Sequence, residues 1–281
     1  MTSQRSISTC AALMAAAITL GAAITVGSVG LSSQAVAADM MVDPAKIMKD
    51  TGVYGLYNTF KVDPSYYTMS MADRGKAAAE VEALVAKHSK GVLVQAYLTR
   101  GFESESDFML RLHAYEPLNA QAFLTDFAAT SIGRHSTATL ALIGVTKGLN
   151  HTTKKKSPEL LEALKSTPYS AEAPKYAFMI PIKKNAMWWN RSEQEKLKLM
   201  EEHTVPTLPF LVNVKRKLYH STGLDDTDFI TFFETPDLVA FNDLNIELHS
   251  VAEMLDNTQY GRPIVMGAIM SVKDVIKTLS K

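Results

Sequence analysis

Hydrophobic positions with a period of 2 and with a period of 3.6 alternate along the chain from about residue 52 onward. The first half of this pattern predicts the order strand, helix, strand, strand, helix, strand. The expected elements are a strand over 52–62, a helix over 70–88, paired strands over 91–99 and 107–115, a helix over 117–130 with proline in its first turn, and a strand over 137–146.

The same order returns after a polar stretch over 148–174. We expect a strand over 176–184, a helix over 192–204 that opens with a Ser-Glu-Gln-Glu capping box, paired strands over 210–220 and 228–234, a helix over 236–255, and a last strand over 263–272. Asp107-Phe108 in the first half matches Asp228-Phe229 in the second. The fold class is therefore predicted to be α+β, with two tandem ferredoxin-like (βαββαβ) repeats whose four-stranded antiparallel sheets pack into a dimeric α+β barrel.

The N-terminus has the pattern of a secretory signal. Arg5 precedes an apolar run over 11–31, and Ala35-Val36-Ala37 is a small-residue cleavage site. We expect a signal peptide over 1–37, cleaved near Ala37, and a periplasmic mature protein that does not bind the membrane. The run is long enough to span a bilayer, so an uncleaved anchor is the alternative. We assign 38–170 to the N-terminal half with its linker, and 171–281 to the C-terminal half.

Charge and cysteine content narrow the kinds of chemistry. The 281 residues carry 29 Lys and Arg against 29 Asp and Glu, so the net charge is zero and gives no electrostatic case for binding nucleic acid. The single cysteine, Cys10, leaves with the signal. A mature chain without thiols excludes thiolate metal sites, iron-sulfur clusters and cysteine nucleophiles, which leaves histidine, carboxylates, arginine or a cofactor.

Candidate functional residues concentrate in the second half. His203 shares a helix face with Leu199 and Met200, which directs the imidazole toward the sheet, although a structural histidine at a helix C-terminus is the alternative. The corresponding stretch of the first half has no equivalent residues, and the position that matches Arg216 is about Gln95.

Arg216 lies on the strand face that also carries Val212, Val214 and Leu218. A buried guanidinium requires an anion, which can be a ligand or an internal carboxylate. The internal candidates are Glu253 and Glu234, of which Glu234 falls on the opposite strand face from Thr231 and Phe233.

A flat apolar guest fits the aromatic residues nearby, although ordinary core packing also accounts for them. The aromatic set is Phe229, Phe233, Trp188 and Trp189. The other histidines show no spacing of a two-histidine metal site; they are His88, His113, His135, His151, His220 and His249. A haem with one protein ligand is the cofactor that suits this composition.

The sequence resembles the chlorite dismutase family, and specifically its long-chain exported members, over essentially the whole mature chain. The resemblance is carried by IPIKKNAMWWN, EEHTVPTLPFL, VKRKLYHSTGLDDTDFITFFE and the duplicated plan. It implies that His203 is the metal ligand of one haem b per subunit, that Glu253 accepts the Nδ1 proton of His203, and that Arg216 is the catalytic distal arginine.

The resemblance also implies the surroundings of the haem. Asn150, Lys184 and Trp188 would lie near its edge and propionates, while Thr231, Phe233 and Leu218 would line the distal pocket. Next to Asn150, where the family has an aromatic hydroxyl, this chain has His151, so the propionate contact at that position is open.

The implied reaction converts chlorite to chloride and dioxygen through a ferryl and hypochlorite intermediate, with Arg216 holding hypochlorite until the O–O bond forms. The family further implies a homo-oligomer, possibly a pentamer. The alternatives are a periplasmic haem-binding carrier and a haem peroxidase of the same superfamily. Cytoplasmic relatives that decarboxylate an iron coproporphyrin usually lack the distal arginine and carry no signal, so Arg216 and 1–37 count against that activity.

Overall fold

The computed structural model describes residues 42–148, 158–166 and 169–281. The predicted signal peptide over 1–37 and the expected haem-edge residue Asn150 with its neighbour His151 lie outside these residues.

The first repeat contains the predicted order of strands and helices, with short additions. Its elements are α1 (Pro44–Ile47), β1 (Tyr54–Val62), the 3₁₀ turn η1 (Pro64–Thr68), α2 (Met71–Arg74), α3 (Ala77–His88), β2 (Leu93–Leu98), β3 (Phe108–Ala114), α4 (Pro117–Ala128), η2 (Gly133–His135) and β4 (Ser136–Val145). The expected helix over 70–88 is divided into α2 and α3 at Gly75, a residue that weakens helices.

The second repeat follows a helix, α5 (Pro158–Ser166), which lies in the stretch noted only as polar. Its elements are β5 (Tyr176–Lys184), α6 (Ala186–Asn190), α7 (Glu193–Thr204), η3 (Val205–Val212), β6 (Lys215–His220), β7 (Phe229–Thr235), α8 (Leu238–His249), η4 (Ala252–Asp256), β8 (Asn257–Tyr260), β9 (Val265–Met270) and α9 (Val272–Leu279). None of the helices in the described ranges is long and apolar enough to cross a bilayer.

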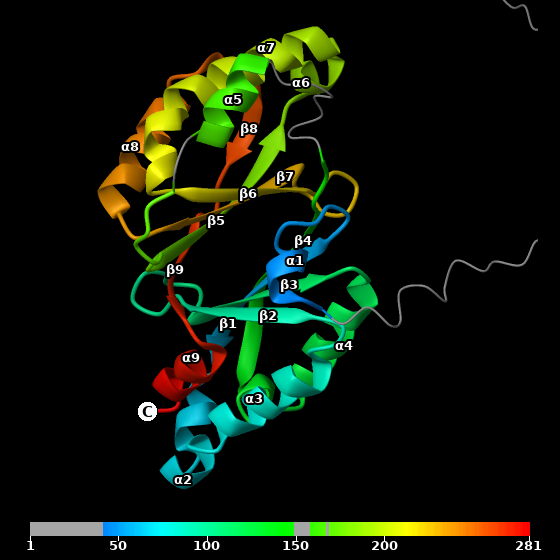
Figure 1. The fold of residues 1–281 in the computed structure, drawn as a ribbon. Coiled ribbons are helices and arrows are strands. Elements are labelled where there is room, and N and C mark those ends of the chain that lie inside the picture. Colours follow the sequence, from blue (N-terminus) through cyan, green and yellow to red (C-terminus); the bar gives the residue numbers. More distant parts are fainter. Residues whose placement is uncertain (1–41, 149–157, 167–168) are drawn as a thin grey trace, which may run out of the picture. The chain divides into compact units, whose positions relative to one another are not determined.

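The two four-stranded sheets join at their edges and close into a barrel. The strand orders are β4-β1-β3-β2 in the first repeat and β6-β7-β5-β9 in the second, with every pairing antiparallel. The sheets meet at β4–β6 and at β2–β9, and β8 extends the second sheet beside β5. Helices α3, α4 and α9 cover the outer face of one sheet, and α7 and α8 cover the other (Figure 1).

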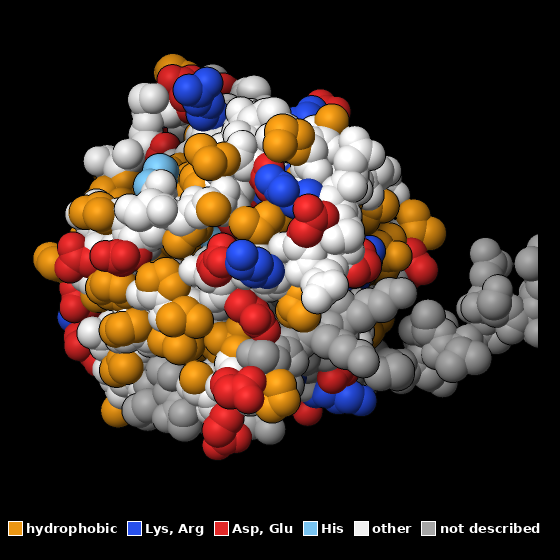
Figure 2. Space-filling model, turned by 90° about the horizontal axis from the view of Figure 1, so that it is seen from above, with side chains coloured by type: hydrophobic (Ala, Val, Ile, Leu, Met, Phe, Trp, Pro, Cys, Tyr) orange, Lys and Arg blue, Asp and Glu red, His pale blue; other side chains and the backbone are white. Residues whose placement is uncertain are grey.

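Three apolar cores follow from this arrangement. One lies between the first sheet and its helices around Phe108 and Phe123, one fills the barrel between the sheets around Met109 and Phe232, and one lies between the second sheet and α8 around Phe233. Figure 2 shows acidic and basic side chains interspersed with apolar ones at the α5–α8 end, as the zero net charge leads us to expect.

Equivalent hydrogen bonds relate the two repeats and correct one alignment. The Asp107 N–H donates to the Phe60 carbonyl, and the Asp228 N–H donates to the Ile182 carbonyl in the same place. With Asp107 matched to Asp228, the strand pairs Val94–Leu112 and Arg216–Phe233 are equivalent. The residue that matches Arg216 is thus Val94 and not Gln95, which faces the barrel interior.

Two predicted elements of the second repeat are shorter than expected. The strand expected over 210–220 begins only at Lys215, because Pro206 and Pro209 hold 205–212 in 3₁₀ turns and leave Val212 exposed. The helix expected over 236–255 ends at His249, because Val251 is extended, and the chain continues as η4 and then as the unpredicted strand β8.

Candidate active site

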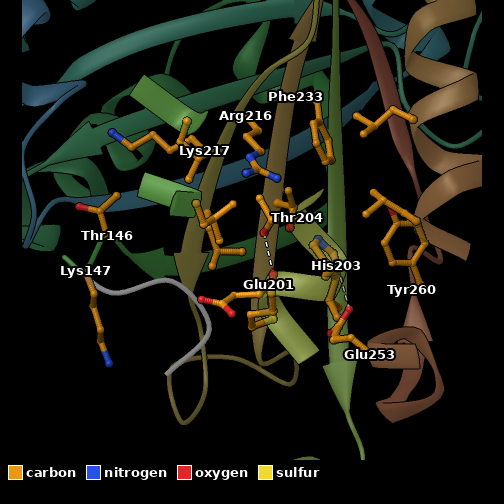
Figure 3. A pocket seen from close by; sticks show the side chains of 18 of the residues that line it. Thr146, Lys147, Glu201, His203, Thr204, Arg216, Lys217, Phe233, Glu253 and Tyr260 are labelled. Atoms are coloured by element: carbon orange, nitrogen blue, oxygen red, sulfur yellow. Dashed lines mark hydrogen bonds and ion pairs between the residues drawn. The ribbon is translucent and has the colours of Figure 1, made fainter. Parts of the chain in front are cut away.

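A cavity of about 380 Å³ lies between the outer face of the second sheet and the helices that cover it. Strands β6 and β7 form one wall, and residues of α7, α8, η4 and β8 form another (Figure 3). Residues 48–51, Thr146, Lys147 and two leucines of α5 also line the cavity. Of the predicted site residues, six line this cavity: His203, Arg216, Leu218, Thr231, Phe233 and Glu253.

His203 enters the cavity from the last turn of α7. The helix starts at the predicted capping box, in which Ser192 and Glu195 exchange side-chain to backbone hydrogen bonds, so its first turn is fixed. Met200, one turn before His203, lines the same cavity. The imidazole Nδ1 donates to the Glu253 carboxylate at 2.9 Å, the hydrogen bond that the resemblance implies.

The environment of His203 keeps its imidazole neutral. Burial, with the positive charges of Arg216 and Lys184 adding to it, lowers the pKa of His203 to about 3. Because Glu253 engages Nδ1, the nitrogen through which this ring can bind a metal is Nε2.

Glu253 is held from its other side by Lys184. The carboxylate is buried on η4 and forms an ion pair with the Lys184 ammonium at the end of β5. The ammonium lies 4.3 Å from the ring centroid of the buried Trp188. Burial lowers the pKa of Lys184 to about 7, against the raising effect of Asp256 and Asp228. Lys184 and Trp188 do not line the cavity but lie behind the carboxylate that supports His203.

Arg216 reaches the same cavity from β6 (Figure 3). Burial lowers the pKa of its guanidinium, which nevertheless stays charged because an arginine is not deprotonated in proteins. Among the described residues no carboxylate lies within ion-pair distance of Arg216, and Glu234 instead pairs with Arg111 inside the barrel at 3.5 Å. The guanidinium is therefore available to an anion that enters the cavity.

Part of the remaining lining is apolar and includes residues that the sequence did not single out. Leu244 and Leu248 of α8 contribute to it, together with Tyr260 of β8, whose hydroxyl donates to the Asn245 side chain at 2.7 Å. The spacing of four residues between the two leucines could have identified them in the sequence as one helix face. Tyr260 lies in a four-residue strand, which is too short to show a periodic pattern. Phe229 does not line the cavity; it is buried and stacks on Trp189.

The donor set determines what the cavity can hold. No group of three or more histidine, cysteine or carboxylate side chains within the described ranges can bind a bare metal ion. One imidazole with its hydrogen-bonded carboxylate, beside apolar residues of α8 and Phe233, instead fits a metal that a flat macrocycle brings with it.

Comparisons with known proteins identify the family of this chain. Residues 74–270 match the family described as Chlorite dismutase. This chain belongs to the chlorite dismutase family. A chlorite dismutase from Ideonella dechloratans is 54% identical over 239 residues, which cover 85% of this chain and 84% of that protein.

Solved structures show the same fold. The chlorite dismutase of Candidatus Nitrospira defluvii in complex with imidazole is 37% identical, with a TM-score of 0.81, over 85% of this chain and 100% of that one. A structure described as a novel haem-binding protein from Thermus thermophilus has a TM-score of 0.68 at 16% identity, over 82% and 96% of the two chains, and shares the fold. The predicted α+β architecture of two ferredoxin-like repeats is thereby confirmed.

Proposed function

We propose that this member of the chlorite dismutase family is a haem b enzyme that decomposes chlorite to chloride and dioxygen. The observation that carries the proposal is that His203 and Arg216 enter one cavity from different elements. His203 is hydrogen-bonded to Glu253, and Arg216 has no carboxylate partner among the described residues. The 54% identical chlorite dismutase supports the substrate, since the identity extends over 85% of this chain.

His203 would hold the haem, one per subunit, through Nε2, while Glu253 keeps the imidazole oriented and electron-rich. The bound haem supplies the iron at which the chlorine–oxygen bond of chlorite is broken. Asn150, Lys184 and Trp188 remain proposed neighbours of the haem edge, with Lys184 and Trp188 supporting Glu253 from behind.

Arg216 would bind the chlorite anion and then retain hypochlorite through charge-assisted hydrogen bonds until both oxygen atoms leave as dioxygen. The reaction balances as one chlorite giving one chloride and one dioxygen, so no reductant is needed. Leu218, Thr231 and Phe233 form the wall around the guanidinium and offer a single hydroxyl, which limits side reactions of hypochlorite.

Chlorite-dependent oxygen release from the haem-loaded protein tests this function. We expect wild type to release one dioxygen per chlorite, measured with an oxygen electrode. Arg216→Ala should lower kcat/KM about 10- to 100-fold, the range for one lost charge-assisted hydrogen bond, at unchanged haem content. Lys215→Ala is the matched control, because Lys215 is the exposed cation next to Arg216 on β6.

Other outcomes distinguish the alternatives. Haem uptake with no oxygen release would identify a haem carrier, which needs His203 but not Arg216. Dye oxidation driven by peroxide, with no turnover of chlorite, would identify a peroxidase.

We also propose that 1–37 is removed during export to the periplasm and that the mature protein is a homo-oligomer such as a pentamer. The Arg5 start, the apolar run and Ala35-Val36-Ala37 support export. Mass spectrometry of the periplasmic protein should give a chain that begins near Ala38, and light scattering should give a multiple of its mass.

A further inference from the structure

Asp256 lies three residues after Glu253 on η4, and its carboxylate is held by Arg191. The guanidinium binds in a bidentate manner, with Nε 2.7 Å from Oδ2 and Nη2 3.0 Å from Oδ1. Asp256 is 1% exposed, so this ion pair is shielded from solvent on the carboxylate side. A fork of this kind fixes the direction as well as the distance between two segments.

The turn that carries Glu253 depends on such external contacts. With five residues it is too short to be held by its own hydrogen bonds, and the extended Val251 separates it from α8. The two residues that flank α6, Asn185 before it and Arg191 after it, both contact η4. Asn185 donates its N–H to the Asp256 carbonyl at 2.8 Å and its side-chain amide to the Leu255 carbonyl at 3.2 Å, and Arg191 follows α6 directly.

Comparison of the repeats separates what the fold needs from what the site needs. In the first repeat, Asp63 donates its N–H to the His135 carbonyl at 2.8 Å, which is the same backbone bond in the same place. The side chain there is a histidine whose Nδ1 lies 3.0 Å from the Ser65 hydroxyl. The backbone bond therefore belongs to the scaffold of both repeats, whereas the ion pair of Arg191 with Asp256 occurs in the repeat with the cavity.

We infer that Arg191 and Asp256 are positioning residues that hold η4 so that the Glu253 carboxylate stays in hydrogen-bond contact with Nδ1 of His203. This inference rests on the proposed function, because it assigns the pair a role through the haem ligand. Loss of the fork lets the turn rotate about its backbone bonds to Asn185, and the hydrogen bond from His203 to Glu253 lengthens. A weaker acceptor makes the imidazole a poorer electron donor to the iron.

The test compares haem-loaded wild type with Asp256→Asn, which keeps the shape of the side chain, and Arg191→Gln, which keeps a polar side chain without the guanidinium. The readouts are the iron–histidine stretching frequency of the ferrous protein by resonance Raman, the ferric/ferrous reduction potential, and the rate of haem transfer to an acceptor protein. We expect a lower stretching frequency, a more positive potential and about tenfold weaker haem retention. Arg191→Lys restores the charge without the fork and should fall between wild type and Arg191→Gln.

A matched control lies in the first repeat. Arg100 binds the buried Asp107 with Nε 2.9 Å from Oδ1, far from η4 in the fold, so Arg100→Gln should lower the thermal midpoint without changing the stretching frequency. The inference is wrong if Arg191→Gln and Asp256→Asn lower the midpoint as Arg100→Gln does while the frequency and potential stay at wild-type values. That result would contradict the positioning role alone, since chlorite turnover by wild type would not be affected. A wild-type protein that takes up no haem would contradict both the positioning role and the proposed function.

Discussion

Single residues show how the second repeat came to hold a cation that faces a cavity. The first repeat also has an arginine near the sheet centre, but Arg111 points into the barrel. Its guanidinium donates to the Tyr219 hydroxyl at 2.8 Å and stacks 3.6 Å from the ring centroid of Phe232. Arg111 therefore finds its partners within the protein, whereas Arg216 lies on the opposite face of the barrel wall, toward α7 and α8. The strand face, set by a single residue of register, decides whether an arginine faces the barrel interior or the cavity.

The buried His113 gives a prediction about acid stability. Burial, with Arg111 and Lys217 adding to it, holds the pKa of His113 well below its usual value of 6.5. Below pH 6.5 the unfolded chain takes up a proton that the folded chain does not, so the free energy of unfolding falls as the pH falls. Between pH 6.5 and pH 5 this loss amounts to up to about 2 kcal/mol.

We expect His113→Gln, which can still bond the Tyr219 hydroxyl, to be less stable than wild type at pH 7 but to lose less further stability on acidification. Urea unfolding of both proteins at pH 7 and pH 5 measures the difference. Equal losses in the two proteins would show that other groups dominate the acid sensitivity.

At the scale of elements, the sequence predicted those that repeat a simple period or carry a start signal. The capping box placed the start of α7, and alternating apolar residues placed β1, β3, β5 and β7. The failures lie where prolines or one extended residue override the apolar pattern, as in η3 and at Val251. The apolar pattern gave no signal for Tyr260 in this irregular region. His203 and Arg216 stood out in the sequence and Glu253 was named from the resemblance, and all three line the same cavity.

The junction of β4 and β6 depends on a glycine. A Cβ at Gly144 would lie 2.8 Å from the Tyr219 Cβ, 2.7 Å from the Ser221 hydroxyl oxygen and 3.2 Å from the His220 carbonyl oxygen. The backbone and Cβ atoms cannot move without separating the strands, which share one residue pair, Val145 with His220. Gly144→Ala should therefore destabilise the protein by about 1 to 3 kcal/mol.

Gly148→Ala is the control for this variant, because within the described part of the chain its added Cβ would meet just the Thr51 methyl at 4.0 Å, an ordinary contact. Thermal unfolding of both variants measures the difference. A Gly144→Ala protein as stable as Gly148→Ala would mean that the strands can separate there at little cost.

At the scale of the whole described fold, duplication predicts two ferredoxin-like sheets but not how their edges meet. The pairs that join the sheets are few, one between β4 and β6 and three between β2 and β9. So small a contact leaves no periodic signal in the sequence. The few strand pairs are supplemented by two side-chain hydrogen bonds. A carboxylate from each acidic turn accepts a hydrogen bond from the last strand of the other repeat.

These two carboxylates occupy equivalent positions. Glu103 accepts the Met266 N–H of β9 at 2.8 Å, and Asp225 accepts the Ile143 N–H of β4 at 3.0 Å. Each bond ties one repeat to the other, so the loss of either should loosen the barrel rather than one sheet. A hydrogen bond to a charged group stabilises by about 1.5 to 3 kcal/mol, and we expect Glu103→Gln and Asp225→Asn each to lose part of this, since an amide oxygen still accepts.

The double variant distinguishes two independent ties from one cooperative closure. The carboxylates have different partners at different junctions, so independent contributions should add to within about 0.5 kcal/mol in urea unfolding. If the double variant is much less stable than this sum predicts, each hydrogen bond can be lost at low cost only while the other is present. The barrel would then open when both are removed. In that case haem retention should fall with the double variant alone, because β6, the strand that carries Arg216, pairs with the first repeat at β4.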